Sequence, residues 1–188
     1  MTWRIDSTHT RVAFAVRHIQ ISKVSGQFTK LDGTVDFDEA EPAHSSVEVQ
    51  IEAASIDTHC GMRDTHLRSA DYFDAQKYPY LTFKSKRIEV VDDRHAEIHG
   101  DLTIKNNTHP VALNVEYRGL DEWPSGGRSA GLTATAALNR QDYGFNMNSL
   151  MLGETVDITI ELEIVEQAAP EPVLAGNQSN DSPEMALS

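Results

Sequence analysis

Cysteine is almost absent from the sequence: the 188 residues include one, Cys60, so no intramolecular disulfide bond can form. Long apolar runs are absent too. No stretch approaches the roughly 18 consecutive apolar residues of a membrane-spanning helix, and we expect no stable membrane insertion. Clusters of Lys and Arg are also lacking, in a chain with a net charge of −13. Because nucleic-acid binding and docking on anionic lipid both need a basic face, these absences argue against either partner.

Catalytic and metal-binding motifs are lacking as well. The sequence has no GxSxG elbow for a nucleophilic serine, no CxxC or HExxH metal motif, and no glycine-rich loop before a helix that could hold a phosphate. His59, Cys60 and His66 invite a metal interpretation, but adjacent side chains on one helix point apart. We therefore predict no catalytic residues, no metal site and no cofactor.

The two ends of the chain set the expected domain limits. The N-terminus, MTWRIDSTHTRV, shows neither the apolar segment nor the small-residue cleavage site of a secretory signal peptide, so we expect a cytoplasmic protein if Met1 is the true start. Residues 1–166 are long enough for one domain with its own core. Residues 167–188 combine Pro, Gly, Asn and Ser without periodicity, which predicts a disordered C-terminal tail.

Alternation of apolar and polar residues is the main positive signal. A period of two is typical of strands with one buried face. Phe28 is out of register with Leu31, which predicts a bulge or bend near Lys30. The absence of strand–helix–strand alternation predicts an all-β protein with an antiparallel sheet. The alternation recurs in eight runs separated by short polar turns: 9–18, 24–38, 46–53, 81–91, 96–105, 111–117, 130–138 and 156–164.

Eight such strands either close into a barrel or fold into a two-sheet sandwich. We favour an extended eight-stranded antiparallel β-barrel, because a barrel of this size has an interior that can hold one small ligand. A sandwich that packs small residues against large ones is the alternative. The barrel is favoured by small residues on the inward faces, which would leave part of the interior unfilled: Ala53, Gly100, Ala130, Ala134 and Ala136.

The alternation breaks once, in the segment that begins SIDTHCGMRDTHLR at Ser55. Asp57 or Thr58 is a suitable N-cap for a short helix over about residues 58–70. The helix must end before Pro79, because the residue that precedes a proline is pushed into an extended conformation. We predict this helix as an insertion between two strands of the barrel.

The inserted segment carries the polar group that most suggests a functional site, Arg63, Asp64 and His66. Asp64 and Arg68 are spaced to pair on the helix surface. One hypothesis is that the polar group closes one end of an apolar cavity and meets the head group of a ligand. The other, which we prefer, is a structural network that holds the helix on the barrel rim.

Several segments together resemble the YceI family, the lipocalin-like polyisoprenoid-binding proteins. The resemblance covers nearly the whole chain to about Glu166, and RDTHLRSADYFD followed by YPYLTFKS is its most specific part. The segments are DSTHTRVAFAVRHIQISKVSGQF, ASIDTHCGMRDTHLRSADYFDAQKYPYLTFKS, GDLTIKNNTHPVALNVEY, LNRQDYG and GETVDITIELE.

The resemblance implies a lipocalin-like barrel around a long apolar pocket. Members of this family bind a polyisoprenoid chain, such as a prenyl quinone, or another long amphiphile, and they are not known as enzymes. Many are exported through a signal peptide, of which this chain shows no sign. The implied function is non-enzymatic binding, storage or transport of an isoprenoid lipid, with a long apolar or amphiphilic small molecule as the partner.

Strand parity and the resemblance together give the candidate ligand-binding residues. Burial of a prenyl chain gains on the order of 25 cal/mol per Å² of apolar area, so the candidates are mostly apolar. Those expected on the barrel wall are Val12, Phe14, Val16, Phe28, Val49, Phe83, Leu102 and Leu132. Those expected at the ends and in a lid are Leu67, Phe73, Tyr143, Phe145, Met147 and Leu150. The polar candidates at the mouth are His18, Arg63, Asp64 and His66.

Two other functions stay open from the residues alone. An enzyme could use a His/carboxylate or metal site at the barrel mouth, built from His18, Arg63, Asp64 and His66. A stress-linked interaction protein could instead bind its partner through the acidic surface or the tail, with the barrel as a scaffold. Pairing of two barrels into a homodimer is open too, because the outward residues Ala13 and Ala15 present a weakly polar strand face.

Overall fold

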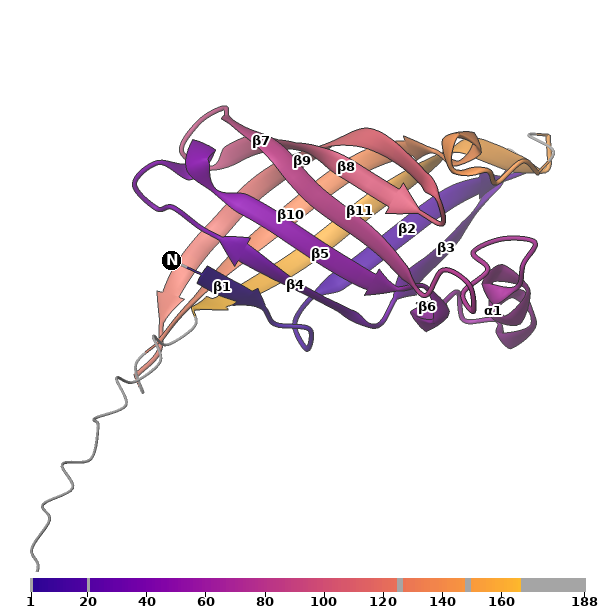
Figure 1. The fold of residues 1–188 in the computed structure, drawn as a ribbon, viewed down its shortest axis with the longest axis horizontal. Helices are drawn as coiled ribbons and strands as arrows, with labels where there is room; N and C mark the ends of the chain where they lie inside the picture. Colours follow the sequence, from indigo (N-terminus) through magenta and orange to yellow (C-terminus); the bar gives the residue numbers. More distant parts are fainter. Residues whose placement is uncertain (1, 20, 125–126, 148–149, 167–188) are drawn as a thin grey trace, which may run out of the picture.

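The chain forms a closed, eight-stranded antiparallel barrel, as expected from the alternation (Figure 1). The computed structural model describes residues 2–19, 21–124, 127–147 and 150–166, so the predicted tail lies outside the described residues. The strand segments are β1 (Thr2–Ile5), β2 (Arg11–His18), β3 (Ser22–Phe28), β4 (Leu31–Asp36), β5 (Ser46–Glu52), β6 (Ile56–Asp57), β7 (Tyr80–Val90), β8 (His95–Ile104), β9 (Asn107–Glu122), β10 (Arg128–Asn139) and β11 (Leu152–Glu166).

Eleven strand segments make eight barrel strands because three of the strands are interrupted. β1 and β2 both pair with β11, with Ile5 opposite Ile164 and Val12 opposite Ile160. On their other side, β1 pairs with β4 and β2 pairs with β3. β5 pairs with β4, and β6 pairs with β3. The pairs β1 and β2, β3 and β4, and β5 and β6 therefore each form one interrupted barrel strand. The pairing of β1 and β2 with β11 closes the sheet on itself.

Consecutive strands are neighbours, so the connections alternate between the two ends of the barrel (Figure 1). One end, which we call the helix end, carries α1 (Gly61–Arg68), η2 (Ala53–Ser55) and η3 (Arg140–Tyr143). The other, the terminal end, carries the start of β1, η1 (Pro42–His44) and the turn between β7 and β8. No helix in the described residues is long and apolar enough to cross a membrane.

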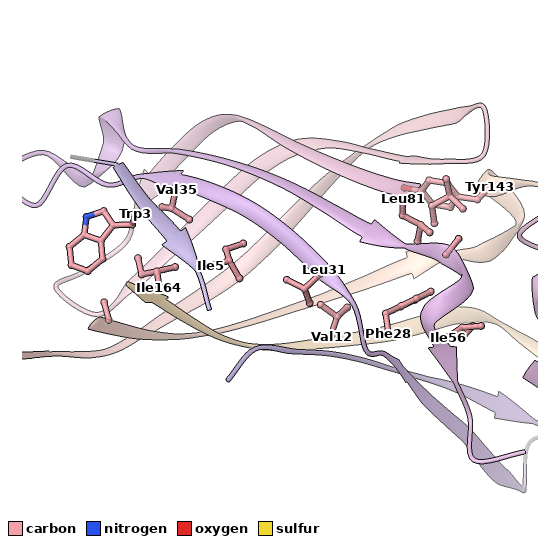
Figure 2. Close-up of a cluster of buried hydrophobic side chains, with 13 residues drawn as sticks. Trp3, Ile5, Val12, Phe28, Leu31, Val35, Ile56, Leu81, Tyr143 and Ile164 are labelled. Carbon is pink, nitrogen blue, oxygen red and sulfur yellow. The ribbon is translucent and has the colours of Figure 1, made fainter. Parts of the chain in front are cut away.

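The terminal end is held together around Trp3, whose side chain is fully buried (Figure 2). Its ring meets Phe37 edge-on, with the ring centroids 6.0 Å apart, and the guanidinium of Arg128 lies 5.3 Å from the Trp3 ring. Arg128 also donates two hydrogen bonds, of 2.8 and 2.9 Å, to the carboxylate of Glu166, and pairs with Glu39 at 2.7 Å. These contacts join β1, β10, β11 and the β4–β5 connection.

Three local expectations differ from the structure. The strand predicted to run unbroken from 81 to 91 shifts register between Ser85 and Arg87, so Ile88 replaces an odd-numbered residue on the inner face. The turn expected at 106–108 is made by Lys105 and Asn106, with Lys105 at a φ of 59°. The helix is shorter than 58–70, and its N-cap position is Cys60 rather than Asp57 or Thr58. Thr58 does not cap the helix, because its hydroxyl donates a hydrogen bond to the Asp64 side chain.

The bend predicted near Lys30 is present, because β3 ends at Phe28 and β4 begins at Leu31. The buried hydroxyl of Ser55 accepts hydrogen bonds from the backbone N–H of Thr29 at 3.2 Å and of Lys30 at 3.1 Å. It donates to the carbonyl oxygen of Glu52 at 2.7 Å. The Ser55 side chain, together with backbone hydrogen bonds from Thr29 to Ser55 and from Glu52 to Lys30, thus satisfies the backbone groups at the bend.

We expect Ser55→Ala to lower the free energy of unfolding by about 1 kcal/mol, because the Lys30 N–H loses the hydroxyl as its acceptor and the Thr29 N–H keeps only the Ser55 carbonyl oxygen. Urea denaturation monitored by circular dichroism measures the change. Ser25→Ala is the matched control, since Ser25 is exposed on β3, and its effect should stay within about 0.5 kcal/mol. Equal stabilities of the two variants would contradict this role of Ser55.

Candidate ligand-binding cavity

A long apolar cavity of about 740 Å³ occupies the barrel interior. Small-molecule sites in proteins usually measure about 300–1,000 Å³, so this volume suits a sizeable ligand. All eleven strand segments contribute lining residues, and nearly all of these residues are aliphatic or aromatic. The lining extends from Asp92 at the terminal end to Phe145 at the helix end.

The structure places twelve of the sequence-predicted residues on the cavity lining. Their part in binding a ligand stays a prediction. On the barrel wall they are Val12, Phe14, Val16, Phe28, Val49, Phe83, Leu102 and Leu132. At the helix end they are Leu67, Phe73, Tyr143 and Phe145.

Small residues on β10 contribute to the free space, since Ala130, Ala134 and Ala136 all line the cavity. Gly100 acts indirectly: a Cβ there would lie 2.6 Å from the Phe83 ring and 2.5 Å from the Lys84 carbonyl oxygen. The glycine therefore gives the Phe83 ring its place on the wall. Ala53 differs from the expectation, because it is buried in η2 and does not line the cavity.

A chain of aromatic rings covers the cavity at the helix end. Phe14 contacts Phe28 with centroids 5.8 Å apart, and Phe28 contacts Phe73 at 5.7 Å. Phe73 then contacts Phe145 at 4.9 Å, and Tyr72 stacks on Phe145 at 6.4 Å. These rings come from two barrel strands, from the segment after α1 and from the segment after η3, so side-chain packing joins the cover to the wall.

Arg63 and Asp64 both form hydrogen bonds with Thr58, at the helix end of the barrel. The backbone N–H and the hydroxyl of Thr58 donate to the Asp64 carboxylate at 2.9 and 2.5 Å. Arg63 donates to the hydroxyl of Thr58 at 2.7 Å and to its carbonyl oxygen at 2.9 Å. Arg68 donates to the carbonyl oxygens of Ala54 and Ile56. In the described residues, Asp64 and Arg68 thus bind other partners instead of the expected surface pair.

The surroundings of Asp64 keep its carboxylate charged. Burial alone would raise the pKa of Asp64, but the hydrogen bonds from Thr58 and the charges of Arg68 and Arg63 outweigh it. The pKa of Asp64 therefore lies below the ordinary value of 3.8. The network holds α1 against the barrel, which agrees with the structural hypothesis.

Six predicted site residues lie off the cavity lining. Arg63 and Asp64 are used in the network at Thr58, and His66 pairs outside with Asp71 at 3.1 Å. His18 ends β2, where the barrel wall stops, and Val16 is the last β2 residue on the lining. Met147 and Leu150 are 41% and 74% exposed and do not line the cavity.

Sequence reasoning missed Arg140, which is buried and borders the cavity. Its guanidinium donates to the carbonyl oxygens of Gly153 at 2.8 Å, of Met147 and Leu152 at 2.9 Å each, and of Phe145. The side chain therefore ties η3 to the start of β11. Backbone carbonyls have no sequence signature, so only the motif LNRQDYG could have drawn attention to this arginine.

Sequence reasoning also missed the polar rim at the terminal end. Asp92, Asp93, Arg94 and His95, in the turn between β7 and β8, border the cavity and are exposed. Glu39 borders the same end from the β4–β5 connection. Exposed lining residues mean that the cavity reaches solvent here, whereas at the helix end Arg140 and Tyr143 are buried.

Two groups of acidic and histidine side chains are close enough to hold a metal ion: Asp6, His9 and Glu163, and Glu89, Glu97 and His99. They do not include His59, Cys60 or His66, and none of their members borders the cavity. Exposed acidic groups of this kind are common without an ion, so neither group changes the account of the cavity.

A family model, the YceI-like domain, matches residues 3–164, which is most of the chain and runs from within β1 to near the end of β11. The chain belongs to the YceI family. It is 36% identical to Protein YceI of Escherichia coli O157:H7 over 162 residues, covering 86% of this chain and 84% of that protein. The predicted resemblance is confirmed.

Solved structures of YceI proteins and of similar barrels have the same fold. The Campylobacter jejuni YceI protein superimposes with a TM-score of 0.74 at 31% sequence identity, covering 81% of this chain and 90% of that one. A polyisoprenoid binding domain from Saccharophagus degradans gives a TM-score of 0.65 at 15% identity, covering 86% and 97%. At that identity the second likeness concerns the fold alone.

We expect Asp64→Asn to lower the free energy of unfolding at pH 7 by about 1–3 kcal/mol, because the amide accepts more weakly from Thr58 and faces Arg63 without a charge. The folded-state pKa of Asp64 is depressed, so its contribution is present above about pH 3.8 and is lost as the pH falls through the folded-state value. The difference from the wild type should therefore shrink below that pH. Urea titrations at pH 7 and pH 3 measure it.

Asp121→Asn is the control for this change, because Asp121 is an exposed carboxylate on β9. It should leave stability at pH 7 within about 0.5 kcal/mol of the wild type. A stability gap for Asp64→Asn that stays constant between pH 7 and pH 3 would refute the assignment to a charged, hydrogen-bonded carboxylate.

Proposed function

We propose that the protein is a non-enzymatic binding protein for an isoprenoid lipid, a polyprenyl chain or a prenyl quinone, which it stores or transports. The observation that carries this proposal is the apolar cavity of about 740 Å³ that extends along the barrel interior. The family membership supports it, and so does the description of the Saccharophagus degradans barrel as a polyisoprenoid binding domain.

The energetics of burial favour a long apolar chain over a small polar ligand. Each buried methylene gains about 0.8 kcal/mol, so about ten carbons gain roughly 8 kcal/mol, the free energy of micromolar binding. Part of this gain offsets the loss of translational and conformational freedom, so a ten-carbon chain should bind measurably but more weakly than this, and micromolar affinity needs a longer chain. The cavity length and its apolar wall suit such chains.

The enzyme hypothesis finds less support in the arrangement of its residues. Arg63 and Asp64 bind Thr58, while His66 pairs with the exposed Asp71. None of the four polar candidates, including His18, lies on the cavity lining. Elemental analysis of the purified protein discriminates the two functions, because stoichiometric zinc or iron would favour the enzyme hypothesis.

Extraction of the purified protein with organic solvent, followed by mass spectrometry, tests the proposal directly. We expect a prenyl lipid to be recovered, or added prenyl quinone to be taken up at one molecule per barrel. If repeated preparations contain nothing apolar and take up no prenyl quinone, the proposed function is wrong.

Leu132→Trp should block uptake, because Leu132 lines the cavity between Tyr117 of β9 and Leu162 of β11, and an indole there fills space the chain needs. We expect at least a tenfold rise in the dissociation constant for a prenyl quinone, with the circular dichroism spectrum unchanged. Thr135→Trp is the control, since Thr135 is exposed on the same strand and should leave binding unchanged. Equal binding by both variants would remove Leu132 from the binding surface.

Cytoplasmic location, homodimer formation and a stress-linked role for the acidic surface or the tail stay predictions. Deletion of residues 167–188 tests the part of the tail, and sedimentation of the purified protein with and without added prenyl quinone tests the dimer. Neither result bears on whether a single barrel binds the lipid.

A further inference from the structure

Tyr143 lines the helix end of the mostly apolar cavity and carries a buried hydroxyl without a partner among the described residues. Its side chain is 2% exposed, it borders the cavity at the end of η3, and Figure 2 shows it at the helix end, far from Trp3. The hydroxyl has no hydrogen-bond partner among the described residues. A buried donor without a partner costs about 1–3 kcal/mol, so most such groups in proteins are satisfied.

The position of the ring is fixed by its surroundings. His109 meets the ring edge-on, with the centroids 5.3 Å apart, and Asn107 donates to the carbonyl oxygen of Tyr143 at 3.2 Å. Gly144 follows at a φ of 80°, a left-handed conformation that ends η3 and that glycine adopts without strain. These contacts come from β9 and from the end of η3, and they leave the phenol with little freedom to seek another partner.

Arg140 is the other buried polar side chain that borders the cavity at this end. Its guanidinium is used in hydrogen bonds to four backbone carbonyl oxygens, so it ties the segment together rather than offering a free recognition group. Its positive charge still favours an oxygen with partial negative charge nearby over a cation. Tyr143 supplies the donor, and Arg140 supplies a favourable potential.

The protonation state of Tyr143 suits a donor. Burial, together with the negative charge of Asp142, raises the pKa of the Tyr143 phenol to about 12, so it keeps its proton at neutral pH. A hydrocarbon against this group would leave the donor unpaired, whereas a carbonyl, ether or hydroxyl oxygen would pair with it. The cavity therefore discriminates between a plain hydrocarbon and an amphiphile.

We propose that the Tyr143 hydroxyl is the head-group site, which donates a hydrogen bond to an oxygen acceptor at one end of the ligand. The ligand then lies with its oxygen-bearing ring or end group at the helix end and its apolar chain directed along the barrel toward the terminal end. This inference rests on the proposed function, because it assigns the orientation and the acceptor chemistry of the lipid in the same cavity.

The test uses the full chain and two probes with the same ten-carbon chain, decylubiquinone, whose ring bears carbonyl oxygens, and decylbenzene, whose ring bears none. We expect Tyr143→Phe to weaken binding of decylubiquinone about 3- to 10-fold and to leave decylbenzene unchanged, with dissociation constants measured by equilibrium dialysis. The ligand-free variant should melt at the same temperature as the wild type or higher, because an unpaired buried hydroxyl has been removed.

Tyr117→Phe is the matched control, since Tyr117 borders the same cavity toward the terminal end. There the charge of Glu39 raises the pKa of its hydroxyl and the charge of Arg128 lowers it. If Tyr117→Phe weakens the binding of decylubiquinone and Tyr143→Phe does not, the ligand lies in the opposite orientation and the inference is wrong. If Tyr143→Phe weakens the binding of both probes equally, or of neither, the hydroxyl is not a head-group site. The proposed function of lipid binding is then unaffected. If the wild type binds neither probe, the proposed function itself fails.

Discussion

Closure of the sheet by the pairing of β1 and β2 with β11 is the constraint on which the rest of the structure depends. A closed barrel has no open edge, so the strand ladders satisfy the backbone groups and the interior needs no polar side chains to complete them. The interior also need not be filled. On β10, Ala130, Ala134 and Ala136 lie opposite Ile164, Ile160 and Ile158 of β11. The branched side chains of β11 therefore fill their part of the interior, while the alanines of β10 leave room in the cavity.

The strands and their inward faces could be predicted because burial on one face imposes a period of two on the sequence. The bend at Lys30 was visible for the same reason, since Phe28 and Leu31 differ in parity and both are buried. The register shift between Ser85 and Arg87 leaves the same signal in the sequence, because Phe83 and Ile88 differ in parity. The polar residues between them also fit a continuous strand, so the sequence did not reveal this shift. Apolar alternation thus predicts faces well and interruptions only where two buried residues lie close together.

The polar contacts at the helix end could not be predicted, because the partners are backbone atoms or other parts of the same segment. The sequence spacing of Asp64 and Arg68 suggests a pair, yet Thr58 offers Asp64 two donors in one place, and Arg68 reaches the carbonyl oxygens of Ala54 and Ile56. Arg140 binds four carbonyl oxygens, which every residue type possesses. Arg63 and Asp64, which most suggested a functional site in the sequence, therefore serve the fold, whereas Arg140 and Tyr143, which border the cavity, were not marked by any such spacing.

This division has a consequence for how the barrel selects a ligand. An unpaired charge on the cavity wall would have to be desolvated whenever an apolar chain entered, at a cost of several kcal/mol. Arg63 and Asp64 lie off the lining, and Arg140, which borders it, is already bound to four carbonyl oxygens, so this cost is avoided at the helix end. Affinity then grows with the length of buried chain, which is nearly the same for any lipid of that length. Discrimination must come from polar groups that a wrong ligand leaves unpaired. At the helix end, the described residues offer the unpaired phenol of Tyr143. Under the proposed head-group site, chain length would set how tightly a lipid binds, and an oxygen acceptor would set which lipid is preferred.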